Sequence, residues 1–449
     1  MTASRTVPPR PSVAAPAAWS FPSGRRWTAP NGLRVLAFDL PGHQLAAARL
    51  IVDLPLDSEP KDGIAALTAS LWSQGAGERD ANAFAGDLSG LGATYNAGVA
   101  GDAIVATLDA PVTGLAEALP LLADSVAAPA FTTDDTARLV RTTLQDLAQA
   151  RTHGESRASD ELYRLTFTRD SRLSRPVLGT IADVESFTAN DVQAFHTANV
   201  APDRATLVLA GDLSTVDIEV AIADAFASWT GSRPAPSPQR PQAASPSALI
   251  VDRAGAAQTT ISLGTPIPDR THPDWAALQL ATYVVGGGMN SRLNSVLREE
   301  KGYTYGITAS LSPERVGGLF LVRCSVATDV TGPAMADLVR ILRTAHTSDI
   351  TERECARARD HFLRAEPIRY QTCAAVADRA GSLVAAHLPD DYPNRHREAV
   401  SALTPAAATE ALHTHIDPDR LSLVTVGDAA TIQADIEKTW PTRPETIPT

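Results

Sequence analysis

Two side chains with strong hydrogen-bonding chemistry, Arg298 and Tyr305, lie seven residues apart in the stretch GGGMNSRLNSVLREEKGYTYGI, which covers residues 286–307. A guanidinium is charged at any working pH and presents a fork of N–H donors, and a phenol adds one O–H donor. The pair can act together only if the local elements hold both groups near one acceptor. The sequence around the two residues therefore decides how they are interpreted.

Three glycines, Gly286, Gly287 and Gly288, open this stretch after the apolar segment LQLATYVV, which is expected to be helical. Glycine permits a sharp chain reversal there. A phosphate-binding loop is disfavoured, because the glycines follow a helix and Gly-Lys-Ser/Thr is absent. Asn290 or Ser291 is expected to cap a second helix, which ends at a glycine. The glycines are thus expected to lie close to the helix that carries the arginine.

The second helix has an apolar side formed by Leu293, Val296 and Leu297. Arg298 shares the other side with three polar residues, Ser291, Asn294 and Ser295, and Gly302 ends the helix. Tyr305 falls on one face of the following strand with Tyr303, Ile307 and Leu311. On these residues alone, the favoured interpretation is a core tyrosine beside a solvated arginine.

Other chemically capable residues form no recognised constellation. None of the ten histidines belongs to a His-x-x-Glu-His or His-Glu-x-x-His motif, and Gly-x-Ser-x-Gly is absent. His413 and His415 form His-x-His, but the matching place earlier in the chain has only His196 and Ala198, so solvated surface is favoured over a ligand set. Cys324, Cys355 and Cys373 are interpreted as reduced, buried thiols.

Composition limits the class of protein. The 449 residues are 44% hydrophobic and 20% charged, typical of a soluble globular chain long enough for two domains. The net charge of −12 argues against nucleic acid or an anionic membrane as partner. No apolar run is long enough to span a membrane, and the first residues lack the apolar region of a secretory signal. A cytoplasmic location is expected.

The chain divides into two related halves. A proline-rich segment, SRPAPSPQRPQAASPS, reads as a semi-extended linker. HTANVAPDRATLVLAGD, ending at Asp212, is matched by LHTHIDPDRLSLVTVGD, ending at Asp428, an offset of 216 residues. Val-Thr-Gly before an amphipathic helix recurs at a similar offset, and a further helix follows each time, starting at Thr133 or Thr351. Two similar domains are therefore predicted from the sequence itself.

The predicted fold class is α+β, because hairpin-like successions of strands precede long helices in each half. Each half is expected to bury one face of a mostly antiparallel sheet under its own helices. The predicted divisions are a disordered lead-in (1–27), an N-terminal domain (28–231), the linker (232–247) and a C-terminal domain (248–449).

The glycine-rich stretch resembles the C-terminal-half motif of the pitrilysin/insulinase type (inverzincin) of zinc metallopeptidase, which includes mitochondrial processing peptidase. The matching residues are Gly286 to Gly288, Ser291, Arg292, Leu293, Leu297, Arg298, Glu299, Gly302 and Tyr305. Similarity extends from about Thr28 to about Asp428 and implies two homologous α+β domains forming half of a clamshell chamber. In that family the arginine and tyrosine reach the active site from the domain opposite the metal, and Gly286, Gly287 and Gly288 are expected to form a loop close to the substrate.

The same resemblance implies that the metal site is degenerate. The family holds zinc with His-x-x-Glu-His on a helix of the first half, and a later carboxylate completes the ligand set. Here Ala66 and Ser70 replace the two histidines, Ala69 replaces the catalytic glutamate, and Asp146 falls at the third ligand. One carboxylate cannot hold zinc, so no metal is expected in this chain, and Asp146 is interpreted as an ordinary exposed helix residue.

Some members of the family are two-chain enzymes in which one chain holds zinc and the other supplies the arginine and tyrosine. This chain resembles the second kind. The resemblance therefore implies a subunit that is inactive alone and that pairs with a same-family chain carrying His-x-x-Glu-His, which provides the zinc. Arg298 and Tyr305 would bind the carbonyl of a peptide substrate and stabilise the oxyanion. The alternative is a catalytically inert scaffold or peptide-binding protein of the same fold.

Overall fold

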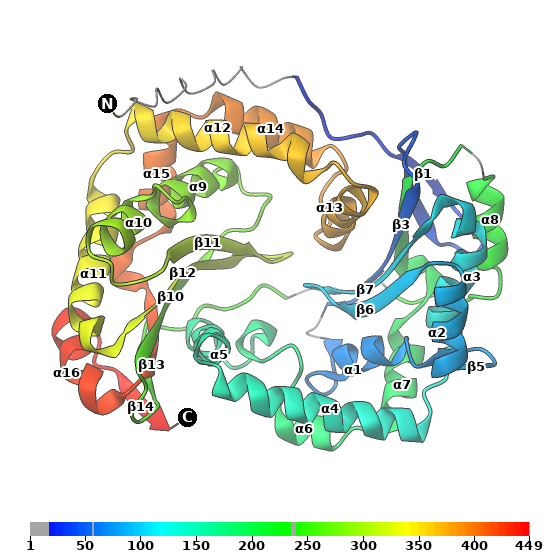
Figure 1. The fold of residues 1–449 in the computed structure, drawn as a ribbon, viewed down its shortest axis with the longest axis horizontal. Helices are drawn as coiled ribbons and strands as arrows, with labels where there is room; N and C mark the ends of the chain where they lie inside the picture. The colour runs from blue at the N-terminus through cyan, green and yellow to red at the C-terminus, as the bar shows by residue number, and fades with distance from the viewer. Residues whose placement is uncertain (1–17, 56–57, 215, 235–238, 449) are drawn as a thin grey trace, which may run out of the picture.

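The computed structural model describes residues 18–55, 58–214, 216–234 and 239–448, and its N-terminal half is built on a six-stranded sheet (Figure 1). The strand order in this sheet is β1-β2-β8-β3-β7-β6. The strands are β1 (Arg25–Thr28), β2 (Arg34–Asp39), β3 (Leu45–Asp53), β6 (Thr94–Val99), β7 (Ala103–Pro111) and β8 (Ala205–Gly211), with β4 (Gly75–Ala76) and β5 (Arg79–Asp80) as a separate pair. The helices are α1 (Ile64–Leu71), α2 (Ala81–Gly90), α3 (Leu115–Ala127), α4 (Thr133–Thr152), α5 (Gly154–Thr166), α6 (Ile181–Glu185), α7 (Ala189–Asn199) and α8 (Ile218–Ala225).

The C-terminal half contains a second six-stranded sheet, in the order β11-β12-β10-β13-β9-β14. Its strands are β9 (Ala248–Asp252), β10 (Gln258–Ile267), β11 (Ile307–Pro313), β12 (Gly318–Ala327), β13 (Ser422–Gly427) and β14 (Glu445–Pro448). Its helices are α9 (Trp275–Thr282), α10 (Arg292–Asn294), α11 (Thr331–Thr347), α12 (Glu352–Arg369), α13 (Cys373–Ala385), α14 (Tyr392–Ala402), α15 (Pro405–His415) and α16 (Ala429–Thr439).

The two sheets share one topology. The order β6-β7-β3-β8-β2 in the first sheet corresponds to β11-β12-β10-β13-β9 in the second. Pairing is antiparallel apart from β2 with β8, β9 with β13 and β9 with β14. This arrangement confirms the predicted α+β class with two similar halves. The repeated Pro-Asp-Arg turns, 202–204 and 418–420, lead into β8 and β13 as equivalent elements. The helix predicted to start at Thr133 is capped one residue earlier, by Thr132, whose side chain accepts the N–H of Asp135.

Each sheet is covered on both faces, and the second face is covered by a helix from the other half. Helix α13 of the C-terminal half packs on β3 and β8, whereas α5 of the N-terminal half packs on β10 and β13 (Figure 1). Val376 and Ala380 of α13 are buried with residues such as Ile51 and Val208 of the N-terminal sheet. Leu162 of α5 belongs to the matching apolar cluster on the C-terminal sheet. The expectation that each half covers one sheet face with its own helices therefore describes only part of the packing.

The N-terminal segment is more ordered than predicted. Residues 1–17 lie outside the described residues, but the chain from 18 onward packs on the C-terminal half. Phe21 is buried, its backbone N–H donates to the side chain of Asn394 (2.7 Å), and Trp19 stacks on Tyr370 with ring centroids 5.6 Å apart. Strand β1 then begins at Arg25. The predicted disordered lead-in (1–27) is therefore wrong for residues 18–27, because two aromatic side chains anchor this segment.

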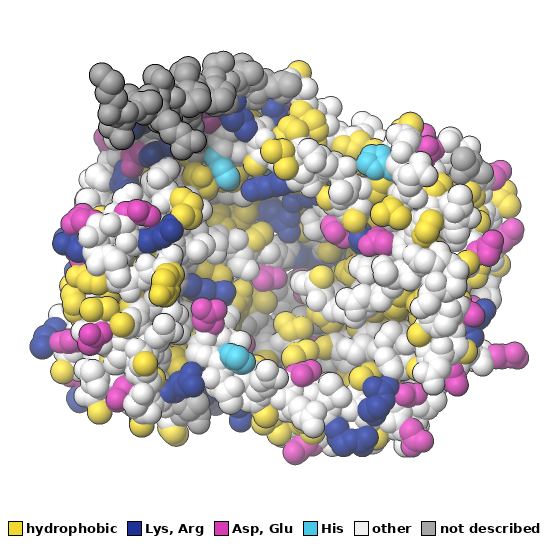
Figure 2. All heavy atoms as spheres, viewed as in Figure 1, with side chains coloured by type: hydrophobic (Ala, Val, Ile, Leu, Met, Phe, Trp, Pro, Cys, Tyr) yellow, Lys and Arg dark blue, Asp and Glu magenta, His cyan; other side chains and the backbone are white. Residues whose placement is uncertain are grey.

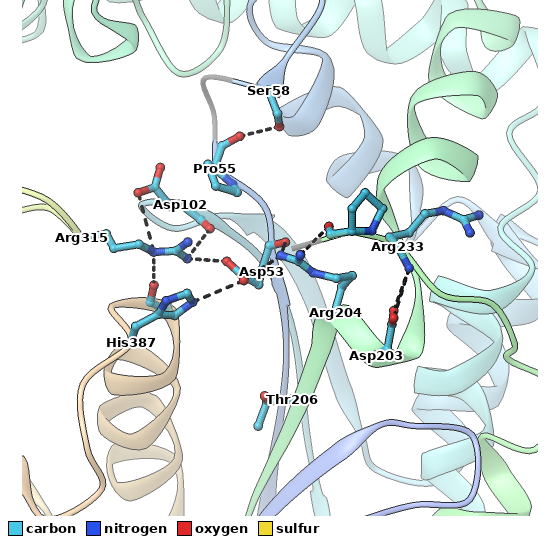
Figure 3. A network of polar contacts seen from close by, with 12 residues as sticks. Asp53, Pro55, Ser58, Asp102, Asp203, Arg204, Thr206, Arg233, Arg315 and His387 are labelled. Atoms are coloured by element: carbon cyan, nitrogen blue, oxygen red, sulfur yellow. Dashed lines mark hydrogen bonds and ion pairs between the residues drawn. The ribbon is translucent and has the colours of Figure 1, made fainter. Parts of the chain in front are cut away.

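A buried polar network also joins the halves (Figure 3). Arg315, in the turn between β11 and β12, forms an ion pair with Asp53 at the end of β3 (2.7 Å). It also donates hydrogen bonds to the backbone carbonyls of Asp102 and Ala385 (both 2.9 Å). On the other side of Asp53, Arg204 donates to its carboxylate (2.7 Å). Burial alone would raise the pKa of Asp53, but His387 and Arg315 bring this pKa below its ordinary value. Asp53 thus links an arginine from each half.

Candidate functional site

The glycine stretch lies where α9 passes into a π-helical turn (Tyr283–Gly287) beside β11. None of the three glycines has a positive φ. A Cβ on Gly286 would lie 2.5 Å from the Cβ of Ala309, and one on Gly288 would lie 2.8 Å from the ring of Tyr283. These glycines are explained by close packing against β11 and Tyr283, and not by the left-handed backbone that often accompanies a chain reversal.

A second π-helical turn (Ser295–Glu300) follows α10 and carries Arg298. Ser291 caps the segment by accepting the N–H of Asn294 (3.3 Å), and Gly302, at φ +64°, ends it as predicted. Such turns are rare and occur often at functional sites. One short stretch therefore contains two such turns, one with Gly286 and Gly287 and the other with Arg298.

Asn294 connects these elements, a role that the sequence analysis missed. It is only 5% exposed, and its side-chain N–H groups donate to the carbonyls of Gly288 (3.2 Å) and Ile307 (2.7 Å), while its oxygen accepts the N–H of Ile307 (3.2 Å). Asn294 and Ser291 were expected on a solvated face with Arg298, but both are buried. The sequence did contain a sign of this role. The Asn294 amide lies within one helical turn of Leu293 and Leu297, and a polar group on a buried face needs hydrogen-bond partners.

Tyr305 is 97% exposed, so its interpretation as a core residue is wrong. It precedes β11 instead of lying within the strand. The hydroxyl of Thr304 lies 2.8 Å from the carbonyl oxygens of Gly306 and Ser325 and accepts the N–H of Gly306 (3.2 Å). These bonds fix the turn while the neighbouring phenol remains in solvent. Tyr303, by contrast, packs against the C-terminal core.

Arg298 is partly exposed and only loosely engaged. One terminal nitrogen lies 3.4 Å from the sulfur of Met289, and Nε lies 3.6 Å from the carboxylate of Glu299. Met289 is itself exposed. A sulfur atom is a weak acceptor, so most of the donor fork remains available to a ligand.

The degenerate motif lies in the other half, on α1, which packs against α4, α7, β6 and β7. Ala66 and Ala69 are buried, and Ser70 is exposed, with its hydroxyl donating to the carbonyl of Ala66 (2.9 Å). Asp146 is an exposed residue of α4, the helix that packs beside α1. The two helices are therefore adjacent, and Asp146 is the one carboxylate among these four residues.

The donor set on α1 and α4 does not fit zinc. Zinc sites in proteins use three or four Cys, His or carboxylate ligands, whereas this position has two methyl groups, one hydroxyl that is already bonded, and one exposed carboxylate. Within the described ranges, one group of three such side chains is close enough to share an ion, and it is His272, Asp274 and His415 in the C-terminal half. The residues on α1 and α4 therefore do not support zinc-based peptidase chemistry at this position.

A cavity of about 380 Å³ lies between the halves. Figure 2 shows that this face of the molecule is hollowed between the halves and that Lys or Arg side chains lie inside the hollow. It is lined by the β6–β7 turn, α5 and the loop after it, the linker and the β11–β12 turn. Glu314 of the β11–β12 turn faces this cavity. Burial raises the pKa of Glu314 to about 7, the negative charge of Asp102 adds to the shift, and Arg270 opposes it.

Comparisons with protein families cover most of the chain. The model described as insulinase (peptidase family M16) matches residues 34–181, and the model described as peptidase M16 inactive domain matches residues 186–362. An uncharacterized zinc protease of Mycobacterium tuberculosis is 28% identical over 78% of this chain and 81% of its own length. One of Streptomyces coelicolor is 24% identical over 80% of this chain and 79% of its own length.

Solved structures show the same fold. A peptidase M16 inactive domain from Pseudomonas fluorescens superposes with a TM-score of 0.84 and 24% identity, covering 90% of this chain and 98% of that one. A protease from Helicobacter pylori gives a TM-score of 0.84 with 16% identity, over 90% and 99% of the two chains. No helix in the described part of the chain is long and apolar enough to cross a membrane.

Proposed function

Because the chain belongs to the insulinase family of peptidases, family M16, we propose that it is the subunit of a two-chain zinc endopeptidase that binds no catalytic zinc itself. Its partner is a same-family chain with an intact His-x-x-Glu-His motif, which brings the zinc, its ligands and the general base. The two chains enclose an unfolded peptide in a chamber between them. This chain contributes Arg298 and Tyr305. The three buried thiols suit a reducing location such as the cytoplasm.

The observation that carries the proposal is the exposure of Tyr305. A tyrosine that is 97% exposed gains little from burial, and the turn made by Thr304 holds it there. Arg298 is likewise loosely held, on a π-helical turn supported by Asn294. Both donors thus project from turns that are held by hydrogen bonds, and neither side chain is part of the hydrophobic core. In contrast, helix α1 of the N-terminal half has Ala66, Ala69 and Ser70 at the positions where the family has its zinc ligands and its general base.

The chemistry assigned to the pair is recognition of one carbonyl oxygen. The guanidinium of Arg298 and the hydroxyl of Tyr305 would donate to the carbonyl of the scissile peptide and hold it more strongly as negative charge develops there. Arg298 also positions the bound substrate, so its loss should raise KM as well as lower kcat. Removing one donor of this kind typically lowers kcat by about 10²–10³.

The test is reconstitution with the partner chain and a fluorogenic peptide. Tyr305→Phe deletes only the phenol hydroxyl, and Arg298→Ala removes the guanidinium group. Matched controls are Tyr303→Phe, which removes a hydroxyl two residues away, and Arg340→Ala, which removes an exposed guanidinium of α11. We expect the first two variants to bind the partner normally and to lose about 10²–10³ in kcat, while both controls retain activity.

Near-normal turnover in both Tyr305→Phe and Arg298→Ala would reject the catalytic contribution and leave the inert scaffold. The chain alone should hydrolyse no peptide. Chelator-sensitive hydrolysis by the purified chain without a partner, abolished by Ser70→Ala or Asp146→Asn, would contradict the assignment of zinc to the other subunit.

A further inference from the structure

Three potential metal ligands from two distant segments meet in the C-terminal half. His272 and Asp274 lie in the connection between β10 and α9, and His415 is the last residue of α15, a helix that packs against α9. His415 Nε2 lies 2.8 Å from Asp274 Oδ2, and His272 Nδ1 lies 3.8 Å from the same oxygen. The two imidazole rings are perpendicular, with centroids 5.0 Å apart.

We propose that His272, Asp274 and His415 form a binding site for a zinc-type divalent cation. Their three ligand atoms lie within 4.8 Å of one another. Zinc bonds of about 2.0–2.2 Å in tetrahedral geometry place neighbouring ligand atoms about 3.3–3.6 Å apart. The observed 2.8 Å and 3.8 Å separations from Asp274 fall on either side of that range, and the two histidine nitrogens lie within 4.8 Å of each other, so side-chain rotations would have to bring the histidines closer.

The local hydrogen bonds define what a cation would replace. The backbone N–H of Asp274 donates to His272 Nδ1 (3.2 Å), which keeps the ring proton on Nε2, and a cation bound at Nδ1 would displace this weak hydrogen bond. His415 Nε2 donates its proton to Asp274, and a cation would replace that proton between the same two atoms. Two imidazoles and one carboxylate leave a fourth position for water, as in many zinc sites.

The type of ligand selects the type of cation. Imidazole nitrogen suits zinc, copper, nickel and iron, whereas magnesium and calcium prefer sites made only of oxygen ligands. The neighbouring histidine of the His-x-His pair is not part of the site. His413 lies beside His346, with ring centroids 5.2 Å apart, so the two histidines at the end of α15 point to different partners. The expectation of solvated surface did not include the contact of His415 with Asp274, which is 141 positions away in the sequence.

A cation at this position would be structural in its effect. It would fasten the start of α9 to the end of α15, and α9 runs directly into the turn with the three glycines. The site is separate from α1, where the family's catalytic zinc would be, so the proposal is independent of the proposed peptidase function. Zinc found in the purified chain would belong to this site, and its removal should leave the reconstituted peptidase's Arg298 and Tyr305 chemistry unaffected.

The experiment uses the metal-free full-length chain without a partner and Zn²⁺ alone as the probe. Isothermal titration should give one saturable site, and Co²⁺ in its place should give the visible absorption of a low-coordinate nitrogen and oxygen site. His272→Ala and Asp274→Asn should each weaken Zn²⁺ binding at least about tenfold. His153→Ala is the matched control, because His153 is an exposed histidine of the other half, and it should bind Zn²⁺ like the wild type.

Zn²⁺ should also raise the melting temperature of the wild type and of His153→Ala, but not that of His272→Ala. Absence of saturable Zn²⁺ binding would overturn the proposal, and so would equal affinity in the wild type and His272→Ala. His272 is partly exposed and precedes the helix, so its substitution leaves the core intact and the comparison is made on folded protein. Binding of Ca²⁺ or Mg²⁺ with similar affinity would also contradict the assignment.

Discussion

Glu314 should make the stability of the chain depend on pH. The residue lies in the cavity between the halves, where burial and Asp102 raise its pKa from 4.5 to about 7. A carboxyl group whose pKa is higher in the folded state stabilises the fold fully below its unfolded pKa, and this contribution is lost as pH rises through the folded pKa. The wild type should therefore lose stability from this one group between about pH 4.5 and pH 7.

The magnitude follows from the size of the shift. A difference of about 2.5 pKa units corresponds to about 3 kcal/mol, because one unit is about 1.4 kcal/mol. Glu314→Gln removes the charge and keeps the shape of the side chain. Between pH 5 and pH 8, the stability of Glu314→Gln relative to the wild type should therefore increase by about 2–3 kcal/mol.

Urea unfolding of both proteins at pH 5 and pH 8 measures this difference. Glu398→Gln is the control, because Glu398 is an exposed carboxylate of α14, and its effect should be small and independent of pH. If Glu314→Gln and the wild type lose stability in parallel between pH 5 and pH 8, the Glu314 carboxyl is solvated and the reasoning is refuted.

Three further predictions concern packing and ion pairs. Arg315→Met should lower the free energy of unfolding by about 3–5 kcal/mol, measured in urea, because it leaves Asp53 buried with fewer partners. Gly286→Ala should cost about 1–3 kcal/mol or prevent folding, since its methyl group would overlap Ala309; thermal melting and near-UV circular dichroism would report the change. Glu354→Gln should make unfolding less sensitive to acid. A hydrogen bond from Arg292 lowers the pKa of Glu354 to about 2. The carboxylate therefore stabilises the fold above about pH 4.5, and this stabilisation is lost as the pH falls toward 2. An unchanged acid transition would contradict it.

The fold could be predicted largely from the sequence, because its signals are local and occur twice. The Pro-Asp-Arg turns and the Val-Thr-Gly starts of helices each depend on a few neighbouring residues, and their similar offsets show two copies. Thr351 and Glu354 at the start of α12 form a capping box, another feature that depends only on residues three positions apart. The strand order, by contrast, depends on pairings between segments far apart in the chain.

The candidate site was only partly predictable. Arg298 and Tyr305 were found through the motif, but periodicity placed Tyr305 in a strand, and the strand begins two residues later. The role of Asn294 depends on the carbonyl of Gly288 and the backbone of Ile307, which the sequence does not show to be adjacent. His272 and His415 are brought together by the packing of α9 on α15, a contact with no local signal.

Helices α5 and α13 each cover the sheet of the other half, and this exchange decides how the protein responds when its chain is divided. Each half expressed alone would expose one apolar sheet face and one apolar helix, so separate halves should aggregate unless they are produced together. A single cut in the proline-rich segment should instead leave a nicked protein whose two pieces remain associated, because both exchanged helices stay in place. Protease cleavage at the linker should therefore show two bands on a denaturing gel and one particle in solution.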